Sequence, residues 1–198
     1  MPWLEWSAAI LSAVSVYLST RENIWSWPTA IVSVAMYAFV FLETGLYSDA
    51  GLQLFYLLIS VYGWYEWLHG GENRTRLHVS RATSKSWVVS AALGFVLWLA
   101  LGLLTSRLKG VSLPFVDSAL ATLSIVAQIM MTRKILENWI LWIIADIVYV
   151  PMYIYKGLYP TALLYAVFLV LAIMGLIAWR KSYARDRGVA PHPAPTPA

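Results

Sequence analysis

The sequence predicts an all-α membrane protein with seven transmembrane helices, and three observations lead to this prediction. First, 60% of the 198 residues are hydrophobic and only 12% are charged, whereas about a quarter of the residues in a soluble domain are charged. Second, apolar runs of roughly 17–25 residues, the length that a helix needs to cross about 30 Å of hydrocarbon, recur seven times. Third, the chain holds eleven Trp and twelve Tyr residues, whose rings are enriched at membrane interfaces.

The seven runs follow one another with short connecting loops. We expect the helices at about 3–20, 24–42, 50–68, 86–105, 114–132, 137–155 and 159–179. The first run has the length of a signal peptide, but it lacks a basic segment before it and a small-residue cleavage site after it, so we expect it to remain in the mature protein. Residues 1–182 are therefore expected to form one transmembrane domain. The polar, then Pro- and Ala-rich residues 183–198 predict a disordered cytoplasmic tail.

An internal repeat relates the first three runs to the last three. Several residues recur 112 positions later, namely Leu11, Ser12, Val14, Thr20 and Arg21 as Leu123, Ser124, Val126, Thr132 and Arg133. The next matches have a separation of 115, which predicts a three-residue insertion: Glu22, Asn23 and Trp27 match Glu137, Asn138 and Trp142. We therefore expect a 3+1+3 parallel repeat, with repeat one at about 3–69, a linking helix at about 86–105 and repeat two at about 114–180. Transporters are often built from such repeats, with the substrate site where the repeats meet.

The Lys and Arg residues predict the orientation of the chain. Only Arg107, Lys109 and Lys156 fall on one side of the seven runs. The other 11 fall on the side that holds the C-terminus, at Arg21, Arg74, Arg76, Arg81, Lys85, Arg133, Lys134, Arg180, Lys181, Arg185 and Arg187. Because cytoplasmic loops carry the excess of Lys and Arg, we expect the N-terminus outside and the C-terminus in the cytoplasm.

The sixth run carries an aromatic stripe with one carboxylate. Trp139, Trp142, Asp146, Tyr149 and Tyr153 have spacings that place them on one face of a helix. A carboxylate at mid-membrane costs at least about 2.5 kcal/mol, so Asp146 is expected to face a polar cavity or a partner. The alternative is an aspartate hydrogen-bonded only for packing. At a separation of 115 its counterpart is Ile31, and a charge in one repeat alone suits an asymmetric substrate.

Other polar and aromatic residues could line the same cavity. Asn138 and Trp142 are four positions apart, and so are their counterparts Asn23 and Trp27. Gln128 shares a helix face with Ser124, while Gln53 and Tyr56 share one with Ser60. Each of these residues alone is equally well explained as an interhelical hydrogen bond. Aromatic rings with amides and one acid together favour a flat heteroaromatic cation as ligand.

Several functions find no support in the sequence. Cysteine is absent, which excludes disulfides and Cys-ligated metals. His69, His78 and His192 lack metal-ligand spacing, and no phosphate-binding or nucleophile motif occurs. We therefore expect neither an enzyme nor a cofactor or metal site, and no segment is long enough for a soluble nucleic-acid module. A non-transporting membrane subunit remains the alternative to a small-molecule transporter.

One stretch resembles a known family. The residues ENWILW at 137–142, continuing through Asp146 to YIYKGLY at 153–159, resemble the signature of the PnuC family of bacterial vitamin transporters, including its W-x-x-W element. Members of that family carry nicotinamide riboside, and relatives carry thiamine or riboflavin. The resemblance points to Asn138, Trp139 and Trp142 as the core of the substrate site, with Gln128 and Asp146 also included.

The resemblance also carries expectations about the whole protein. It implies a SWEET-like repeat fold in the bacterial inner membrane, and facilitated diffusion by alternating access. It further implies a homotrimer, and trapping of the vitamin by a cytoplasmic kinase. The residues expected to bind substrate are Trp142, Trp139, Asn138, Asp146, Gln128, Trp27, Asn23, Tyr149, Gln53 and Tyr56.

Overall fold

The structure is a computed structural model that describes residues 2–43, 47–107, 114–155, 157 and 159–188. This part of the chain forms seven α-helices, which are α1 (Pro2–Thr20), α2 (Ser26–Glu43), α3 (Tyr47–His69), α4 (Ser84–Thr105), α5 (Pro114–Thr132), α6 (Asn138–Tyr155) and α7 (Tyr159–Gly188). One 3-10 helix, η1 (Glu72–Arg74), lies between α3 and α4. The predicted all-α fold is confirmed, and each helix coincides with one of the predicted apolar runs.

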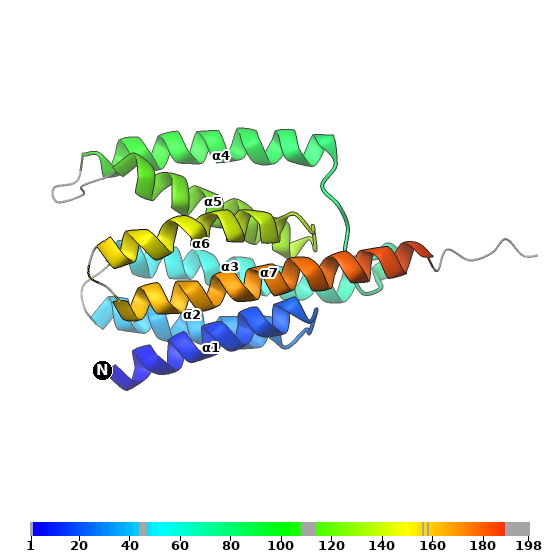
Figure 1. The fold of residues 1–198 in the computed structure, drawn as a ribbon, viewed down its shortest axis with the longest axis horizontal. Helices are drawn as coiled ribbons and strands as arrows, with labels where there is room; N and C mark the ends of the chain where they lie inside the picture. The colour runs from blue at the N-terminus through cyan, green and yellow to red at the C-terminus, as the bar shows by residue number, and fades with distance from the viewer. Residues whose placement is uncertain (1, 44–46, 108–113, 156, 158, 189–198) are drawn as a thin grey trace, which may run out of the picture.

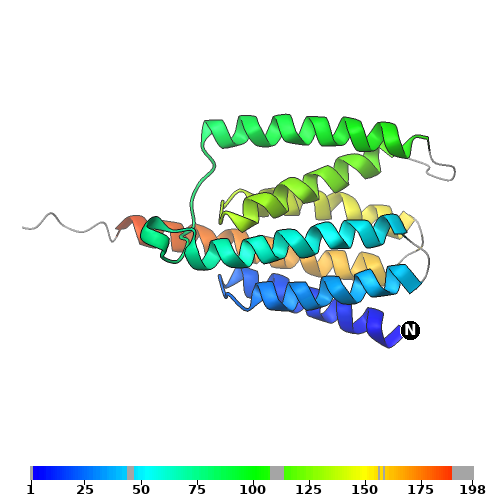
Figure 2. The same ribbon diagram turned by 180° about the vertical axis from the view of Figure 1, so that it is seen from behind.

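The helices run side by side, and six of them form the body of the molecule (Figures 1 and 2). Helix α2 packs between α1 and α3, and we call these three helices the first half. In the second half, formed by α5–α7, helix α6 packs between α5 and α7. The two halves meet where α1 contacts α7 and where α3 contacts α5. Helix α4 packs against α5 and lies at the edge of the bundle, as both views show.

Five helices are long and apolar enough to cross a membrane, namely α2, α4, α5, α6 and α7. Helices α1 and α3 fall below that hydropathy because they carry more polar residues, among them Ser12, Ser15 and Ser19 on α1. The outer face of α1 is nevertheless apolar, since the exposed Trp3, Trp6 and Ile10 follow helical spacing. Helix α4 is apolar on all sides and buries only Gly102, as expected for a helix surrounded by lipid.

Helix α7 is longer than the sequence predicts. It continues to Gly188, so residues 183–188 are helical, and the prediction of a disordered tail from 183 is wrong for this stretch. These residues are too polar for an apolar run, and in the structure the Asp186 carboxylate lies 3.0 Å from His78 Nδ1 in the α3–α4 linker. Residues 189–198 of the predicted tail lie outside the described residues.

The two halves share one register, with a separation of 112 throughout. Helices α1 and α5 begin and end 112 positions apart, and so do α2 and α6. Helices α3 and α7 each begin at a tyrosine, and these two tyrosines are also 112 positions apart. The turn after α1 and the turn after α5 also agree: Asn23 N–H donates to Leu18 O, and Ile135 N–H donates to Met130 O, each at 3.0 Å.

The predicted three-residue insertion is therefore wrong. Trp27 is the second residue of α2 and corresponds to Trp139, the second residue of α6, rather than to Trp142. The counterpart of Asp146 is Val34 rather than Ile31. The prediction failed because the pattern Glu-Asn-x-x-x-Trp recurs at a separation of 115. The residues that occupy equivalent positions in the two turns are separated by 112 and are less similar to each other.

Candidate functional site

One end of the bundle is closed by contacts between the two halves. It is the end where α1, α3 and α5 finish and where α7 continues, at the right of Figure 1. We call it the basic end because it carries Arg21, Arg74, Arg76, Arg81, Arg133, Lys134, Arg180, Arg185 and Arg187. Its interior is apolar and consists mainly of tryptophan.

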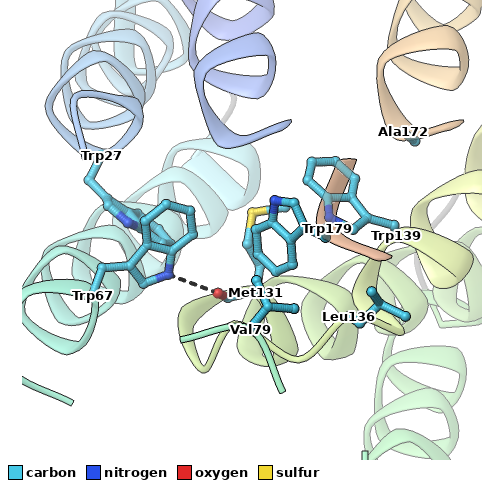
Figure 3. Packing of buried hydrophobic residues seen from close by; sticks show 8 residues of the cluster. All are labelled: Trp27, Trp67, Val79, Met131, Leu136, Trp139, Ala172 and Trp179. Carbon is cyan, nitrogen blue, oxygen red and sulfur yellow. Dashed lines mark hydrogen bonds between the residues drawn. The ribbon is translucent and has the colours of Figure 1, made fainter. Parts of the chain in front are cut away.

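Four tryptophans form a row across the basic end. Trp27 packs edge-on against Trp67, with ring centroids 5.3 Å apart and planes at 90°. Trp139 packs in the same way against Trp179, at 5.4 Å and 89°. Trp67 and Trp179 join the two pairs at 5.8 Å, and Figure 3 shows Trp27 and Trp67 at the left of the view with Trp179 and Trp139 to their right. T-shaped aromatic pairs are each worth about 0.5–1.5 kcal/mol beyond their buried area.

Two glycines make room for this row. A Cβ atom at Gly63 would overlap the ring of Trp27, and one at Gly175 would overlap the ring of Trp139. Both glycines lie one turn before a tryptophan of the row, Trp67 or Trp179. Only glycine allows the indole ring to lie directly on the helix backbone at these two places.

One tryptophan of each half also donates a hydrogen bond to the other half. Trp67 Nε1–H donates to Met131 O at 3.1 Å, and Trp179 Nε1–H donates to Ser19 O at 3.0 Å. The acceptors lie one residue before the ends of α5 and α1, where helix carbonyls lack partners within the helix. The third helix of each half is thus fastened to the first helix of the other half.

A buried ion pair joins the two turns at the same end. Lys134 Nζ lies 3.0 Å from Glu22 Oε2, and it also lies 4.6 Å from the ring centroid of Trp67. The Lys134 side chain is 8% exposed and the Glu22 side chain 24%. Burial lowers the pKa of Lys134 from its ordinary value, and the Glu22 carboxylate acts in the opposite direction.

The α3–α4 linker crosses the basic end and is bonded to the turn after α5. Ser80 N–H donates to Lys134 O, and Leu136 N–H donates to Ser80 O. Glu137 is the main anchor, because its carboxylate accepts from Arg81 Nε at 3.0 Å and from Ala82 N–H at 2.8 Å. The glutamate of the ENWILW stretch therefore holds the linker in place.

Above the row of tryptophans lies a cavity of about 370 Å³ lined by α1, α2, α3, α5, α6 and α7. Its volume is in the range of small-molecule sites. Eight of the ten residues that the sequence predicts for the site line it, namely Trp27, Gln53, Tyr56, Gln128, Trp139, Trp142, Asp146 and Tyr149. Trp27 and Trp139 belong to both the row and the cavity, so the row forms the floor of the cavity.

The other two predicted site residues do not line the cavity. Asn23 lies in the turn after α1, where its Oδ1 accepts from Trp25 N–H at 3.0 Å. Asn138 is fully buried at the start of α6, and its Nδ2 donates to Ile135 O at 2.7 Å. Both side chains hold turns at the basic end, which is a common role for asparagine beside a helix.

Asp146 is the charged group of the cavity wall. The residue is 3% exposed and is the ninth of the eighteen residues of α6. Among the described residues it has neither a hydrogen-bond partner nor a cation within ion-pair distance. An unpaired carboxylate at this depth is costly, so a cationic ligand or ordered water would stabilise it.

Three indole N–H groups in the cavity wall also lack an acceptor. Nε1 of Trp27, Trp139 and Trp142 is buried without a hydrogen bond in the described part of the chain. A buried donor without an acceptor costs about 1–3 kcal/mol. The cavity wall therefore holds three unpaired indole donors and one carboxylate.

The sequence analysis missed a group of serines and two tyrosines. The cavity is also lined by Ser12, Ser15, Ser19, Ser26, Ser33, Tyr37 and Tyr165. Ser12, Ser15 and Ser19 share one face of α1, and this spacing could have revealed them. Tyr165 packs against Tyr149, with ring centroids 4.7 Å apart. Within the described residues, no cluster of His, Asp and Glu could hold a metal ion.

Comparisons with known proteins agree with this architecture. A family model described as nicotinamide mononucleotide transporter matches residues 2–181. The nicotinamide riboside transporter PnuC of Escherichia coli (strain K12) is 30% identical, covering 95% of this chain and 89% of its own. The riboflavin/roseoflavin transporter RibM of Streptomyces davaonensis is 28% identical, covering 93% of this chain and 87% of its own.

A solved structure shares the fold. The crystal structure of the vitamin B3 transporter PnuC matches with a TM-score of 0.72 and 26% identity, covering 92% of this chain and 83% of that chain. The resemblance seen at 137–159 is thus confirmed along nearly the whole sequence, and with it the prediction of a membrane transporter rather than an enzyme. The chain belongs to the nicotinamide mononucleotide transporter family.

Proposed function

We propose that this protein takes up nicotinamide riboside, and that the ligand binds in the cavity between the two halves. The observation that carries the proposal is Asp146, a buried carboxylate without a cationic partner among the described residues, which lines a cavity walled by Trp139 and Trp142. Nicotinamide riboside has a flat, positively charged pyridinium ring. The ring can stack on tryptophan while its charge is balanced by the carboxylate.

The charge of the cavity favours the riboside over the mononucleotide that gives the family its name. A mononucleotide adds a phosphate, which needs Arg, Lys or backbone N–H donors when it is buried. No Lys or Arg is among the residues that line the cavity, and Asp146 would repel the phosphate. The E. coli relative named for nicotinamide riboside supports the same choice.

Riboflavin is the second candidate, because the RibM relative is named for it. Its ring system is neutral, so it would use the tryptophans and the indole donors but gain little from Asp146. Thiamine, which is cationic, is the third. Calorimetric titration of the purified protein with nicotinamide riboside, thiamine and riboflavin separates the three. Tightest binding of the riboside supports the proposal, whereas failure of the riboside to bind contradicts it.

The proposed mechanism is facilitated diffusion with alternating access. All seven helices cross the bacterial inner membrane as a 3+1+3 parallel repeat with a SWEET-like arrangement, in which α4 links the halves. The shared register of 112 supports the repeat, and the apolar outer face of α1 supports a crossing by that helix. Because no driving ion is part of the mechanism, a cytoplasmic kinase would trap the vitamin, and the protein would function as a homotrimer.

The basic end is proposed to face the cytoplasm, since cytoplasmic loops carry the excess of Lys and Arg. The closed row of tryptophans then separates the cavity from the cytoplasm. A reporter that is active only in the periplasm, fused after Gly188, should be silent. The same reporter placed before Pro2 with a suitable leader should be active, and the reverse pattern would contradict the orientation.

A further inference from the structure

The residues of the cavity wall differ between the two halves at several corresponding positions, and six of these positions form two sets. Three positions in the first half have serine where the residue 112 positions later is alanine: Ser15, Ser33 and Ser60 correspond to Ala127, Ala145 and Ala172. Three positions in the second half have a larger polar or aromatic residue: Gln128, Trp142 and Asp146 correspond to Val16, Ala30 and Val34. The three serines, and Gln128, Trp142 and Asp146, all line the cavity.

The two sets differ in chemistry. The first half adds hydroxyl groups and the second half adds a ring, an amide and a carboxylate. A ligand with the same groups at both ends would need no such difference between the halves. The wall is therefore shaped for a ligand with a hydroxyl-rich arm at one end and a charged or aromatic ring at the other.

We propose that the ligand lies across the cavity in one orientation, with its hydroxyl-rich arm on the hydroxyl wall, formed by Ser15, Ser33 and Ser60. Its ring lies on the wall formed by Gln128, Trp142 and Asp146. The proposal rests on the proposed function, because it assigns an orientation to the ligand of the same site. It makes the three serines determinants of specificity for a polyhydroxylated arm such as a ribose.

The hydrogen bonds that the serines already make determine whether each hydroxyl can act as a donor or as an acceptor toward a ligand. Ser15 Oγ–H donates to Ser26 O at 2.8 Å, and Ser33 Oγ–H donates to Ala8 O at 2.7 Å. Since both hydrogens are committed, the two oxygens face a ligand as acceptors. Sugar hydroxyls are donors of the matching kind.

Ser60 offers both a donor and an acceptor. The residue is 2% exposed, lines the cavity, and has no hydrogen-bond partner in the described part of the chain. An arm with several hydroxyls would give this group a hydrogen-bond partner.

Helix packing alone does not account for the serines. Small residues allow helices to approach closely, but alanine fills the same three positions in the second half, where Ala127 and Ala145 are fully buried. The backbone arrangement therefore accepts alanine at these places. The hydroxyl groups of Ser15 and Ser33 also bond α1 to α2, whereas the hydroxyl of Ser60 is an addition to the packing.

The test removes one hydroxyl and compares ligands with and without the arm. Ser60→Ala deletes a hydroxyl that holds no other group, and Ser7→Ala on α1, outside the cavity lining, is the matched control. The probes are nicotinamide riboside and 1-methylnicotinamide, which keeps the cationic ring and lacks the sugar, with affinities measured by calorimetry and by displacement. Loss of one neutral hydrogen bond is expected to weaken riboside binding about three- to tenfold and to leave 1-methylnicotinamide binding unchanged.

Equal weakening of both probes, or no weakening of the riboside, would overturn the orientation. Asp146→Asn distinguishes the two walls, because it should weaken both cationic probes. If the wild-type protein binds no riboside, the proposed substrate fails, and the orientation is tested with riboflavin and lumiflavin, which differ by the ribityl arm. Ser60→Ala must then weaken riboflavin alone, and a loss with both flavins, or with neither, overturns the inference.

Discussion

The basic end and the cavity treat the two halves of the molecule differently. At the basic end two kinds of contact are matched between the halves: Trp67 donates to Met131 O as Trp179 donates to Ser19 O, and Trp27 packs on Trp67 as Trp139 packs on Trp179. In the cavity the halves diverge, with serines on one side and Trp142 and Asp146 on the other. The matched tryptophans close the bundle at the basic end, whereas the unmatched serines, Trp142 and Asp146 line the cavity. We expect changes in the first group to affect mainly stability and changes in the second group to affect mainly ligand binding.

The largest effect is expected from the ion pair at the basic end. Lys134→Met removes the cation and leaves the partly buried Glu22 carboxylate without its partner, which is expected to lower the free energy of unfolding by about 3–5 kcal/mol. Thermal unfolding in detergent, followed by tryptophan fluorescence, measures the loss. The double variant Lys134→Met/Glu22→Gln should recover most of it, and Lys85→Met, at an exposed position, serves as control. A tolerated single variant would mean that the pair does not fasten the halves.

The next effect concerns the charge of the cavity. Asp146→Asn keeps the shape of the side chain and removes its charge, so binding of nicotinamide riboside should weaken by about 1.5–3 kcal/mol, the value of a hydrogen bond to a charged group. Binding of neutral riboflavin should change much less. Titration calorimetry of both ligands checks the difference. Equal losses for the two ligands would place Asp146 among the residues that only hold the fold.

Trp142 is expected to contribute slightly less. Trp142→Ala removes a stacking surface and should weaken ligand binding by about 1–3 kcal/mol, the range for stacking of a base on an aromatic side chain. Its counterpart in the first half is already an alanine, Ala30, so the fold should tolerate the change. Trp25→Ala, at an exposed residue of the α1–α2 turn, is the control. Unchanged affinity would assign Trp142 to packing.

The smallest effect tests the symmetry of the basic end. Trp67→Phe and Trp179→Phe each keep an aromatic ring and delete one N–H donor. Each variant should lose about 0.5–1.5 kcal/mol of stability, and the two losses should agree because the two bonds have nearly equal lengths. Substrate affinity should be unaffected in both. A large difference between the stability losses of the two variants would mean that the two hydrogen bonds are not equivalent.

Much of the fold could be predicted from the sequence because membrane helices are long apolar runs with short loops. The order of the helices and their approximate bounds follow directly from hydropathy. The end of α7 could not be predicted in this way, since its last residues are charged and polar rather than apolar. The predicted register of the repeat was wrong because it was chosen from identical residues at a separation of 115. The two turns have equal lengths in the structure, which requires a separation of 112.

The candidate site divides in the same way. The sequence could predict that the face of α6 with Trp139, Trp142 and Asp146 lines the cavity, because a carboxylate among aromatic residues in an apolar run is rare. The serines were overlooked because serine is ordinary in membrane helices, where it commonly bonds a neighbouring backbone. Asn138 does not line the cavity, and in sequence a side chain that closes a turn looks the same as one that contacts a ligand.

The pairing of Glu22 with Lys134 has a consequence for how the chain assembles. The two residues occupy the same place in their halves, and both have positive φ angles, 53° and 47°. A bundle made of two copies of one half would bring two glutamates, or two lysines, together in a partly buried position where like charges repel. Because these corresponding positions carry opposite charges, association of the first half with the second is favoured. Association of either half with a second copy of itself is disfavoured.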